Sequence, residues 1–300
     1  MKILQHKAFT DKILKYDSVV QLVDKYQLFL VDLWGVIHDG AELYDGVKNC
    51  LEELRAANKK IIFLSNAPKR EKTTREILTK LGISSDLYDG VITSGEVARE
   101  YIISNKHDLG KKYFIFEEQE SDLLFLENNE YKRVNSVSES DFILAIGFNR
   151  PNPSLEELKT TLCQSLRKNN PMICANPDLV IVDKKGNQSM CAGVMAKKYV
   201  KMGGKVLYFG KPHNEIYKKA FLMFPDIEKK NICAIGDNIE TDIKGGNTLD
   251  IDTYLIAGGI HGYDLGIKHG EIPEYKRLLQ LCDNYSVRPT GVLSSFVFTK

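Results

Sequence analysis

The chain has 300 residues, of which 43% are hydrophobic and 27% are charged, a composition typical of globular proteins with one or two domains. Its 41 Lys and Arg nearly match its 40 Asp and Glu, so no overall field favours nucleic acid or an acidic membrane surface. No apolar run approaches the ~20 residues that cross a membrane, and no signal peptide is recognisable. We therefore expect a cytoplasmic enzyme or binding protein.

Short apolar runs alternate with amphipathic stretches along most of the chain. Strands are predicted at 27–37, 60–66, 89–94, 205–210, 231–237 and 251–259. Helices are predicted at 47–60, 69–82, 95–105 and 214–224, and one more opens near Thr241. Apolar strands that alternate with helices predict a doubly wound parallel α/β sheet.

The middle of the chain repeats this pattern on a smaller scale, over 111–118, 141–148, 154–169, 171–182 and 189–204. We interpret it as a second α/β module inserted into the first, with edges near Ser94 and Gly204. The predicted domains are a core, residues 1–93 and 205–300, and an insert, residues 94–204. The last stretch, 271–298, predicts one helix and a poorly defined tail.

The six cysteines form no CxxC pair, and most lie in apolar surroundings. This favours buried, reduced thiols over disulfides or a zinc site. Cys191 has no basic neighbour in the sequence, so we expect a buried thiol there too.

Polar residues follow several of the predicted strands. They are Asp32, Ser65, Asn66, Lys211, Asp237 and Asp242. For each of these residues the alternative to a functional role is a structural one, as the cap of a turn or helix or as an exposed surface charge. Ligands of such sheets bind at the carboxyl ends of strands, and a hard cation and a phosphoryl group require oxygen ligands and fixed donors. Together the residues predict a metal and phosphate site at one edge of one sheet.

Four segments, DLWGVIHDG, LSNAPKR, FGKPHNEIYKKA and AIGDNIETDIKGG, resemble in this order the four motifs of the haloacid dehalogenase superfamily. More narrowly, they are similar to its class IIA branch, the NagD-like sugar and nucleotide phosphatases. The gap from Asn66 to Lys211 holds ITSGEVAREYI, ANPDLVIV and CAGVMAKKYVKMGG, which resemble class IIA cap segments. The resemblance implies a Rossmann-like core with an inserted α/β cap of the C2 type, and hydrolysis of phosphoric monoesters.

The resemblance also implies roles for single residues. Asp32 would take the phosphoryl group as an aspartyl phosphate, Ser65 would bind its oxygens, and Lys211 would neutralise charge. Asn66 would shape the loop. The implied Mg²⁺ ligands are Asp32, Asp237 and the backbone carbonyl of Trp34, with Asp242 orienting them. In the cap, Asn176 would border the substrate and Gly193 would let a helix N-terminus approach it. Both cap residues also fit a purely structural role.

Trp34 departs from the family pattern, because phosphatases of this superfamily normally carry a second Asp two residues after the nucleophile. An indole N–H cannot donate a proton to the leaving group or activate water. We expect poor leaving groups, such as sugar alkoxides, to turn over slowly. His38 or Asp39 are candidate substitutes. One alternative is that IHDG forms a plain turn, and another is that Trp34 stacks on a substrate ring or packs at the seam between core and cap.

Three functions follow from these observations. The first is Mg²⁺-dependent hydrolysis of a small phosphorylated metabolite through Asp32. The second is a catalytically impaired relative that binds a phosphorylated metabolite as a sensor or partner protein, which Trp34 favours. The third is phosphotransfer to an acceptor other than water. A small phosphorylated substrate is the expected partner, with neither nucleic acid nor membrane. The oligomeric state stays open, since the apolar tail after Arg288 fits packing inside the chain or against a second subunit.

Overall fold

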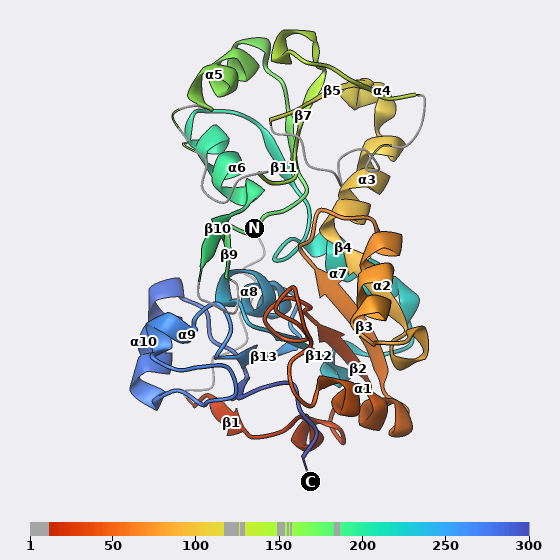
Figure 1. Ribbon diagram of the computed structural model, residues 1–300, viewed down its shortest axis with the longest axis vertical. Helices are drawn as coiled ribbons and strands as arrows, with labels where there is room; N and C mark the ends of the chain where they lie inside the picture. The colour runs from red at the N-terminus through yellow and green to blue at the C-terminus, as the bar shows by residue number, and fades with distance from the viewer. Residues whose placement is uncertain are drawn as a thin grey trace, which may run out of the picture. The chain divides into compact units, whose positions relative to one another are not determined.

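The computed structural model describes residues 12–116, 126, 130–148, 154, 156, 158–182 and 187–299 (Figure 1). The chain divides into two compact units. The first comprises residues 1–64, 79–90 and 220–300, and the second comprises residues 65–78 and 91–219. The domain boundaries expected near Ser94 and Gly204 stay a prediction.

A seven-stranded sheet contains most strands of the first unit. Its strands are β1 (Leu14–Tyr16), β2 (Leu28–Val31), β3 (Lys60–Ser65), β4 (Gly90–Thr93), β12 (Ile232–Gly236), β13 (Asp252–Ile256) and β14 (Gly291–Leu293). Their order is β1-β14-β13-β12-β2-β3-β4, and β2 pairs in parallel with both β3 and β12. The strand order reverses between β2 and β12, which is where ligands bind in such sheets. The predicted parallel α/β fold is confirmed.

Helices of the first unit follow the apolar spacing of the sequence. They are α1 (Val47–Ala56), the π-helix η6 (Ile239–Ile243), α8 (Lys244–Thr248), α9 (Gly262–Leu265) and α10 (Tyr275–Tyr285). On α1, Val47, Cys50, Leu51 and Leu54 recur at helical spacing and are all buried. Figure 1 shows α9 and α10 side by side, and both contribute to one core cluster with β13 and β14.

Two further helices, α2 (Glu71–Lys80) and α7 (Asn214–Met223), each include residues of both units. Short 3-10 turns lie at Val19–Leu22, Ser85–Leu87, Val137–Glu139 and Lys229–Asn231. The helix predicted at 69–82 begins two residues later than expected.

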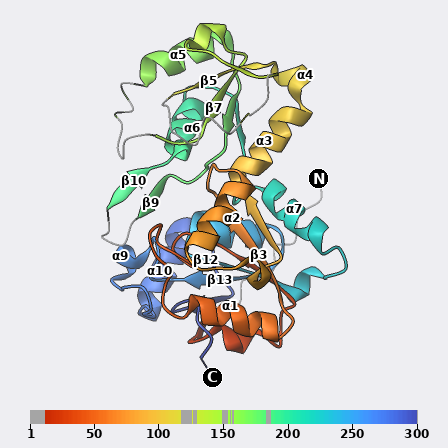
Figure 2. The ribbon, with the colours of Figure 1, turned by 45° about the vertical axis from the view of Figure 1, so that its right-hand side comes forward.

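A parallel five-stranded sheet forms the centre of the second unit. Its strands, in spatial order, are β11 (Val206–Tyr208), β8 (Met172–Cys174), β7 (Phe142–Ala145), β5 (Lys112–Ile115) and β6 (Lys132–Arg133). Its helices are α3 (Ser94–Ser104), α4 (Lys106–Leu109), α5 (Lys159–Lys168) and α6 (Ala192–Lys201). Figures 1 and 2 show α5 and α6 on one side of this sheet and α3 on the other. The insert is therefore an α/β module, as predicted.

The two predicted segments 171–182 and 189–204 each contain two elements. They include an antiparallel pair, β9 (Val180–Val182) and β10 (Gln188–Met190), between β8 and α6. Residues 117–118 of the predicted strand at 111–118, and 155 and 157 of the predicted helix at 154–169, lie outside the described residues.

The strand before Lys211 belongs to a different sheet from the one predicted. β11 pairs with β8 in the five-stranded sheet and not with the strands that precede Asp32 and Asp237. The expectation that all the candidate residues follow strands of one sheet is therefore wrong for Lys211. Periodicity predicts that 205–210 is a strand, but the choice of sheet depends on a partner more than thirty residues away.

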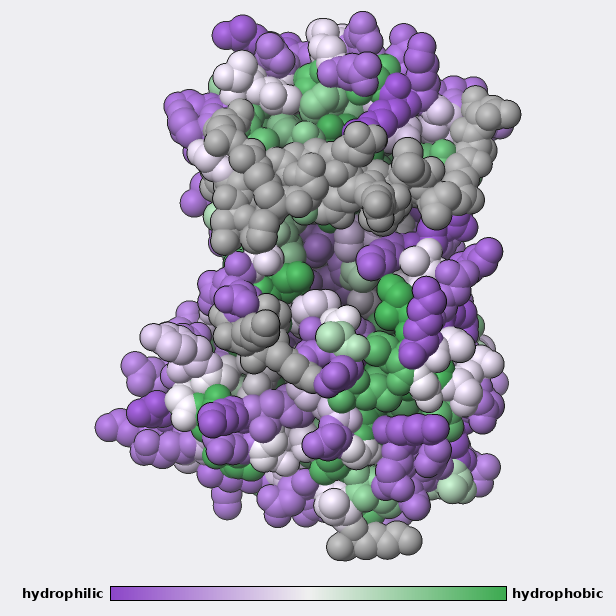
Figure 3. Space-filling model, in the orientation of Figure 1, coloured by the Kyte–Doolittle hydropathy of each residue, from purple (hydrophilic) through white to green (hydrophobic). Residues whose placement is uncertain are grey.

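The tail after Arg288 is ordered and packs within the chain. β14 extends the seven-stranded sheet, and Val292, Leu293 and Phe296 are fully buried. Figure 3 shows hydrophilic side chains over most of the visible face, in keeping with the balanced charges. Among the helices of the described residues, none has the length and apolar character to cross a membrane.

Candidate active site

Three buried carboxylates meet at the carboxyl edge of the seven-stranded sheet. Asp32 follows β2, Asp237 follows β12, and Asp242 lies on η6. Each offers a ligand oxygen, and these oxygens all lie within 4.8 Å of one another. The residues are only 3–9% exposed. The structure thus brings together three of the predicted site residues at the point where the strand order reverses.

Backbone groups hold each of these carboxylates. Asp32 accepts from the N–H of Leu33 (2.8 Å), and Asp237 accepts from the N–H of Ile260 (2.8 Å). Asp242 accepts from the N–H of Asn238 at 3.2 Å. These hydrogen bonds fix the direction of each carboxylate.

Two glycines make room for these carboxylates. A Cβ on Gly35, whose φ is +81°, would lie 2.1 Å from Oδ2 of Asp237. A Cβ on Gly236 would lie 2.0 Å from Cγ of Asp242. The backbone that follows Trp34 therefore lies directly against the Asp237 carboxylate. The three carboxylates offer oxygen ligands alone, and a set of oxygen ligands suits a hard cation such as Mg²⁺.

His261, which the sequence gave no reason to select, lies close to this site. Its Nε2 accepts from the N–H of Ile239 at 3.1 Å, at the start of η6. Burial lowers the pKa of His261 to about 4, although the nearby Asp264 and Asp242 oppose that shift. The imidazole is therefore neutral near pH 7 and serves as an acceptor for the helix that carries Asp242.

The loop after Asp32 packs around Trp34. The Trp34 ring lies edge-on to His38, with 5.8 Å between ring centroids. A Cβ on Gly40 would lie 2.4 Å from Cη2 of the indole. His38 Nδ1 accepts from the N–H of Gly40 (2.9 Å), and Asp39 accepts from the amides of residues 41 and 42. These bonds to turn amides favour the reading of IHDG as a turn.

Ser65, Asn66 and Lys211 belong to the second unit. Ser65 ends β3, and its Oγ accepts from the N–H of Ala67 at 3.2 Å. Asn66 contacts Lys211 twice: its Oδ1 accepts from the Lys211 N–H (2.7 Å) and its Nδ2 donates to the Lys211 carbonyl (3.0 Å). Lys211 is only 2% exposed, so its expected alternative as a surface lysine is wrong.

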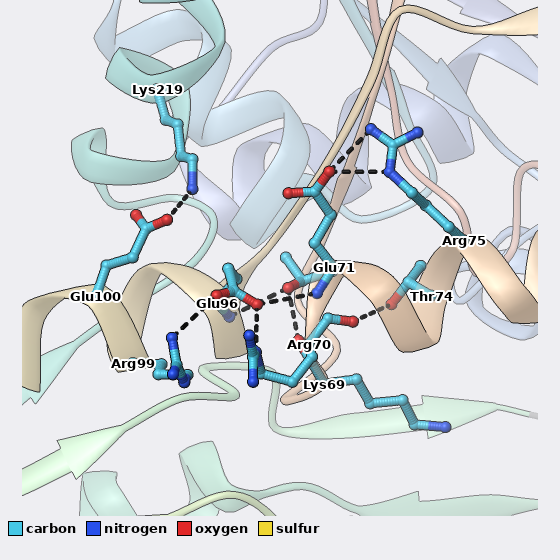
Figure 4. Close-up of polar contacts among 10 residues, drawn as sticks. Lys69, Arg70, Glu71, Thr74, Arg75, Glu96, Arg99, Glu100 and Lys219 are labelled. Atoms are coloured by element: carbon cyan, nitrogen blue, oxygen red, sulfur yellow. Dashed lines mark hydrogen bonds and ion pairs between the residues drawn. The ribbon is translucent and has the colours of Figure 1, made fainter. Parts of the chain in front are cut away.

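The loop that follows Asn66 is anchored by Glu96 of α3, as Figure 4 shows. The Glu96 carboxylate accepts from Nε of Arg70 (2.7 Å) and from the N–H of Glu71 (3.1 Å). Arg99 lies 3.6 Å from its other oxygen. Glu96 was not among the residues selected from the sequence. Its position as a charged residue between the small and apolar residues of TSGEVA was a signal by which it could have been found.

Asn176 and Gly193, the two candidate residues of the insert, both contact the backbone of Asp178. Asn176 accepts from the N–H of Asp178 at 3.2 Å, and the Gly193 N–H donates to the Asp178 carbonyl at 3.1 Å. A Cβ on Gly193 would lie 2.2 Å from the Pro177 carbonyl oxygen, so the start of α6 requires glycine there. These contacts give both residues a structural role.

Cys191 precedes α6 and is 4% exposed. Burial raises the pKa of its thiol to about 12, which makes a thiolate nucleophile at neutral pH unfavourable. All six cysteines are free, and five of them are buried.

Comparisons with known proteins agree on one family. Residues 29–132 match a family model described as haloacid dehalogenase-like hydrolase, and residues 208–275 match one described as HAD-hydrolase-like. The chain is 28% identical over 251 residues to an acid sugar phosphatase of Staphylococcus epidermidis, covering 83% of this chain and 92% of that protein.

Solved structures give the same result for the fold. A haloacid dehalogenase-like hydrolase from Brucella suis superposes with a TM-score of 0.79 at 27% identity, covering 94% of this chain and 100% of that chain. A structure assigned as a nagD protein superposes with a TM-score of 0.63 at 26% identity, covering 79% and 90%.

Proposed function

Since the chain belongs to the haloacid dehalogenase superfamily, in its class IIA, NagD-like branch, we propose that it is a Mg²⁺-dependent phosphatase that hydrolyses a small phosphate ester through Asp32. The observation that carries the proposal is the cluster of Asp32, Asp237 and Asp242, with ligand oxygens within 4.8 Å, where the strand order reverses. The acid sugar phosphatase among its relatives supports a small phosphorylated metabolite as substrate.

The carboxylates of Asp32 and Asp237 and the carbonyl of Trp34 would hold the Mg²⁺, and Asp242 would orient them. The Gly35 backbone lies against the Asp237 carboxylate. This supports the proposal that the carbonyl of Trp34, one residue earlier, is a Mg²⁺ ligand. When bound, Mg²⁺ supplies positive charge that stabilises the transferring phosphoryl group.

In the first step, an oxygen of Asp32 attacks phosphorus, an aspartyl phosphate forms, and the bond to the leaving alcohol oxygen breaks. Ser65 would donate a hydrogen bond to a phosphoryl oxygen, and Lys211 would neutralise developing charge. In the second step, the oxygen of a water molecule attacks phosphorus, the bond between phosphorus and the Asp32 oxygen breaks, a water proton passes to solvent, and inorganic phosphate and the free Asp32 carboxylate result. Asp32 follows β2 and Ser65 is the last residue of β3, and these two strands pair in parallel, which supports a joint action on one phosphoryl group.

Trp34 supplies no titratable group for either step. General acid–base catalysis is typically worth about 10²–10⁴-fold, so alkyl phosphates should react slowly. Aryl and acyl phosphates have good leaving groups and need little protonation. The expected substrate preference is therefore for leaving groups of low pKa.

A series of phosphate esters with leaving groups of increasing pKa tests this proposal. We expect kcat to fall steeply along the series in the presence of Mg²⁺, and activity to vanish in D32N. If the wild-type protein cleaves alkyl and aryl esters equally well, the prediction that Trp34 makes the hydrolysis of alkyl esters slow is wrong.

A second candidate function is binding of a phosphorylated metabolite without efficient turnover. Trp34 at the position of the second Asp is the observation that favours it. Tight phosphate-ester binding, measured by calorimetry with Mg²⁺, together with no phosphate release from any ester in the series, would establish this function instead.

A further inference from the structure

The backbone of Lys211 is held at two points by one side chain. Asn66 Oδ1 accepts from the Lys211 N–H (2.7 Å), and Asn66 Nδ2 donates to the Lys211 carbonyl (3.0 Å). Both contacts are buried. A two-point contact fixes the direction of the lysine backbone and hence the origin of its side chain.

Only one orientation of the Asn66 amide satisfies both groups. The oxygen and nitrogen of an amide occupy nearly the same shape, so shape alone does not choose between the two orientations. The backbone of Lys211 does, because its N–H must face Oδ1 and its carbonyl must face Nδ2, and Asp178 reinforces this choice by accepting the second N–H of Asn66 Nδ2 at 2.8 Å. In the flipped orientation, the amide oxygen of Asn66 would face this carboxylate, and two acceptors would oppose each other.

The surroundings leave Asn66 no easy alternative position. A Cβ on Gly210, whose φ is +104°, would lie 2.5 Å from Asn66 Oδ1, so the backbone just before Lys211 approaches the amide closely. Ser94 Oγ donates to the carbonyls of Ala67 (3.1 Å) and Ala175 (2.6 Å). This bridge ties the loop of Asn66 to the segment that leads to Asp178.

We propose that Asp178 is a positioning residue, whose carboxylate holds the Asn66 amide in the orientation that fixes the backbone of Lys211. The inference rests on the proposed function, in which Lys211 neutralises the phosphoryl charge. Asp178 lies 112 residues from Asn66 in the sequence, within the inserted module. The placement of Lys211 therefore depends on the insert as well as on its own strand.

Three variants test the proposal with an aryl phosphate as substrate and saturating Mg²⁺. D178A removes the acceptor, and we expect kcat to fall about tenfold with little change in KM. D178N keeps an oxygen of the same shape that still accepts from Asn66, so it should retain at least half of the activity. D141A is the matched control, because it removes another carboxylate acceptor of the same unit, one that accepts from the backbone amides of Lys111 and Lys112. It should leave kcat unchanged.

The double variant N66A/D178A tests whether Asp178 acts through Asn66. If it does, D178A lowers kcat less than twofold in the N66A background. Hydrogen exchange of the Lys211 amide, measured in the same proteins, should become about tenfold faster in D178A and stay unchanged in D178N and D141A.

Equal loss of kcat in D178N and D178A would overturn the proposal, since the carboxylate charge would then act by itself. Unchanged kcat in D178A would overturn it as well. A wild-type protein that releases no phosphate would instead refute the proposed function. In that case, Lys211 amide exchange that is identical in D178A and wild type would also refute the positioning role, and faster exchange in D178A alone would support it.

Discussion

Trp34→Asp introduces a carboxylate at the position where the superfamily normally carries its second Asp. The backbone of this loop does not depend on the indole, because the Gly35 N–H donates to the His38 carbonyl (2.9 Å) and the His38 N–H donates to the Leu33 carbonyl (3.1 Å). The carbonyl of residue 34 should therefore stay in place. The new carboxylate would supply the missing acid and base.

The expected gain depends on the leaving group. For an alkyl phosphate we expect kcat/KM to rise by about 10²-fold, the lower end of what general acid–base catalysis contributes. For an aryl phosphate, the gain should stay below about fivefold, because its leaving group needs little protonation. The substitution should also lower the free energy of unfolding by about 1–3 kcal/mol, since Trp34 loses its contacts with His38 and Gly40.

Trp34→Asn is the matched control, because it has the shape of Asp without a titratable group. Steady-state rates of the two variants on both esters provide the measurement. If Asn accelerates the alkyl ester as much as Asp does, added space explains the gain, and the reasoning about a missing proton donor is refuted. No gain with Asp refutes it equally.

Two further predictions concern stability. Glu96→Ala should lower the free energy of unfolding by about 2 kcal/mol, because it removes the buried carboxylate that accepts from the half-buried Arg70 and from the N–H of Glu71, whereas Glu100→Ala in the same helix breaks an exposed pair and should cost less than about 1 kcal/mol. Urea denaturation measures both, and similar losses would contradict the role given to Glu96. Burial lowers the pKa of His261 to about 4, so below pH 6.5 the unfolded chain binds a proton that the folded chain does not. Stability should therefore fall by about 3 kcal/mol between pH 6.5 and pH 4, relative to His261→Gln, whose side-chain amide reaches the position of Nε2 and does not titrate. Urea denaturation across this range checks it, and equal pH dependence in the two proteins would exclude His261 as the cause.

Local patterns predicted the parts of the fold that depend on neighbouring residues. The apolar runs LFLV and ICAIG became buried parallel strands, and Asp32 and Asp237 were recognised because they follow them directly. The strands β1 and β14 were missed because three residues are too few to show alternation. The sheet that β11 joins was predicted wrongly, since pairing is a property of distant partners.

The candidate site shows the same division. Asp32, Asp237 and Asp242 belong to recognisable motifs, and the structure brings their carboxylates together. Glu96 was missed, and Asp178 was recognised only as part of the cap segment ANPDLVIV, because their contacts with Arg70 and Asn66 are remote in the sequence. Such contacts leave no local periodicity to detect.

The most direct test of the central claim is phosphate release from an aryl phosphate by wild-type protein and D32N, with Mg²⁺ and after its removal by chelation. We predict turnover that requires both Mg²⁺ and the carboxylate of Asp32. Turnover by D32N at the wild-type rate, or a wild-type rate unaffected by chelation, would contradict hydrolysis through Asp32 at a cation site.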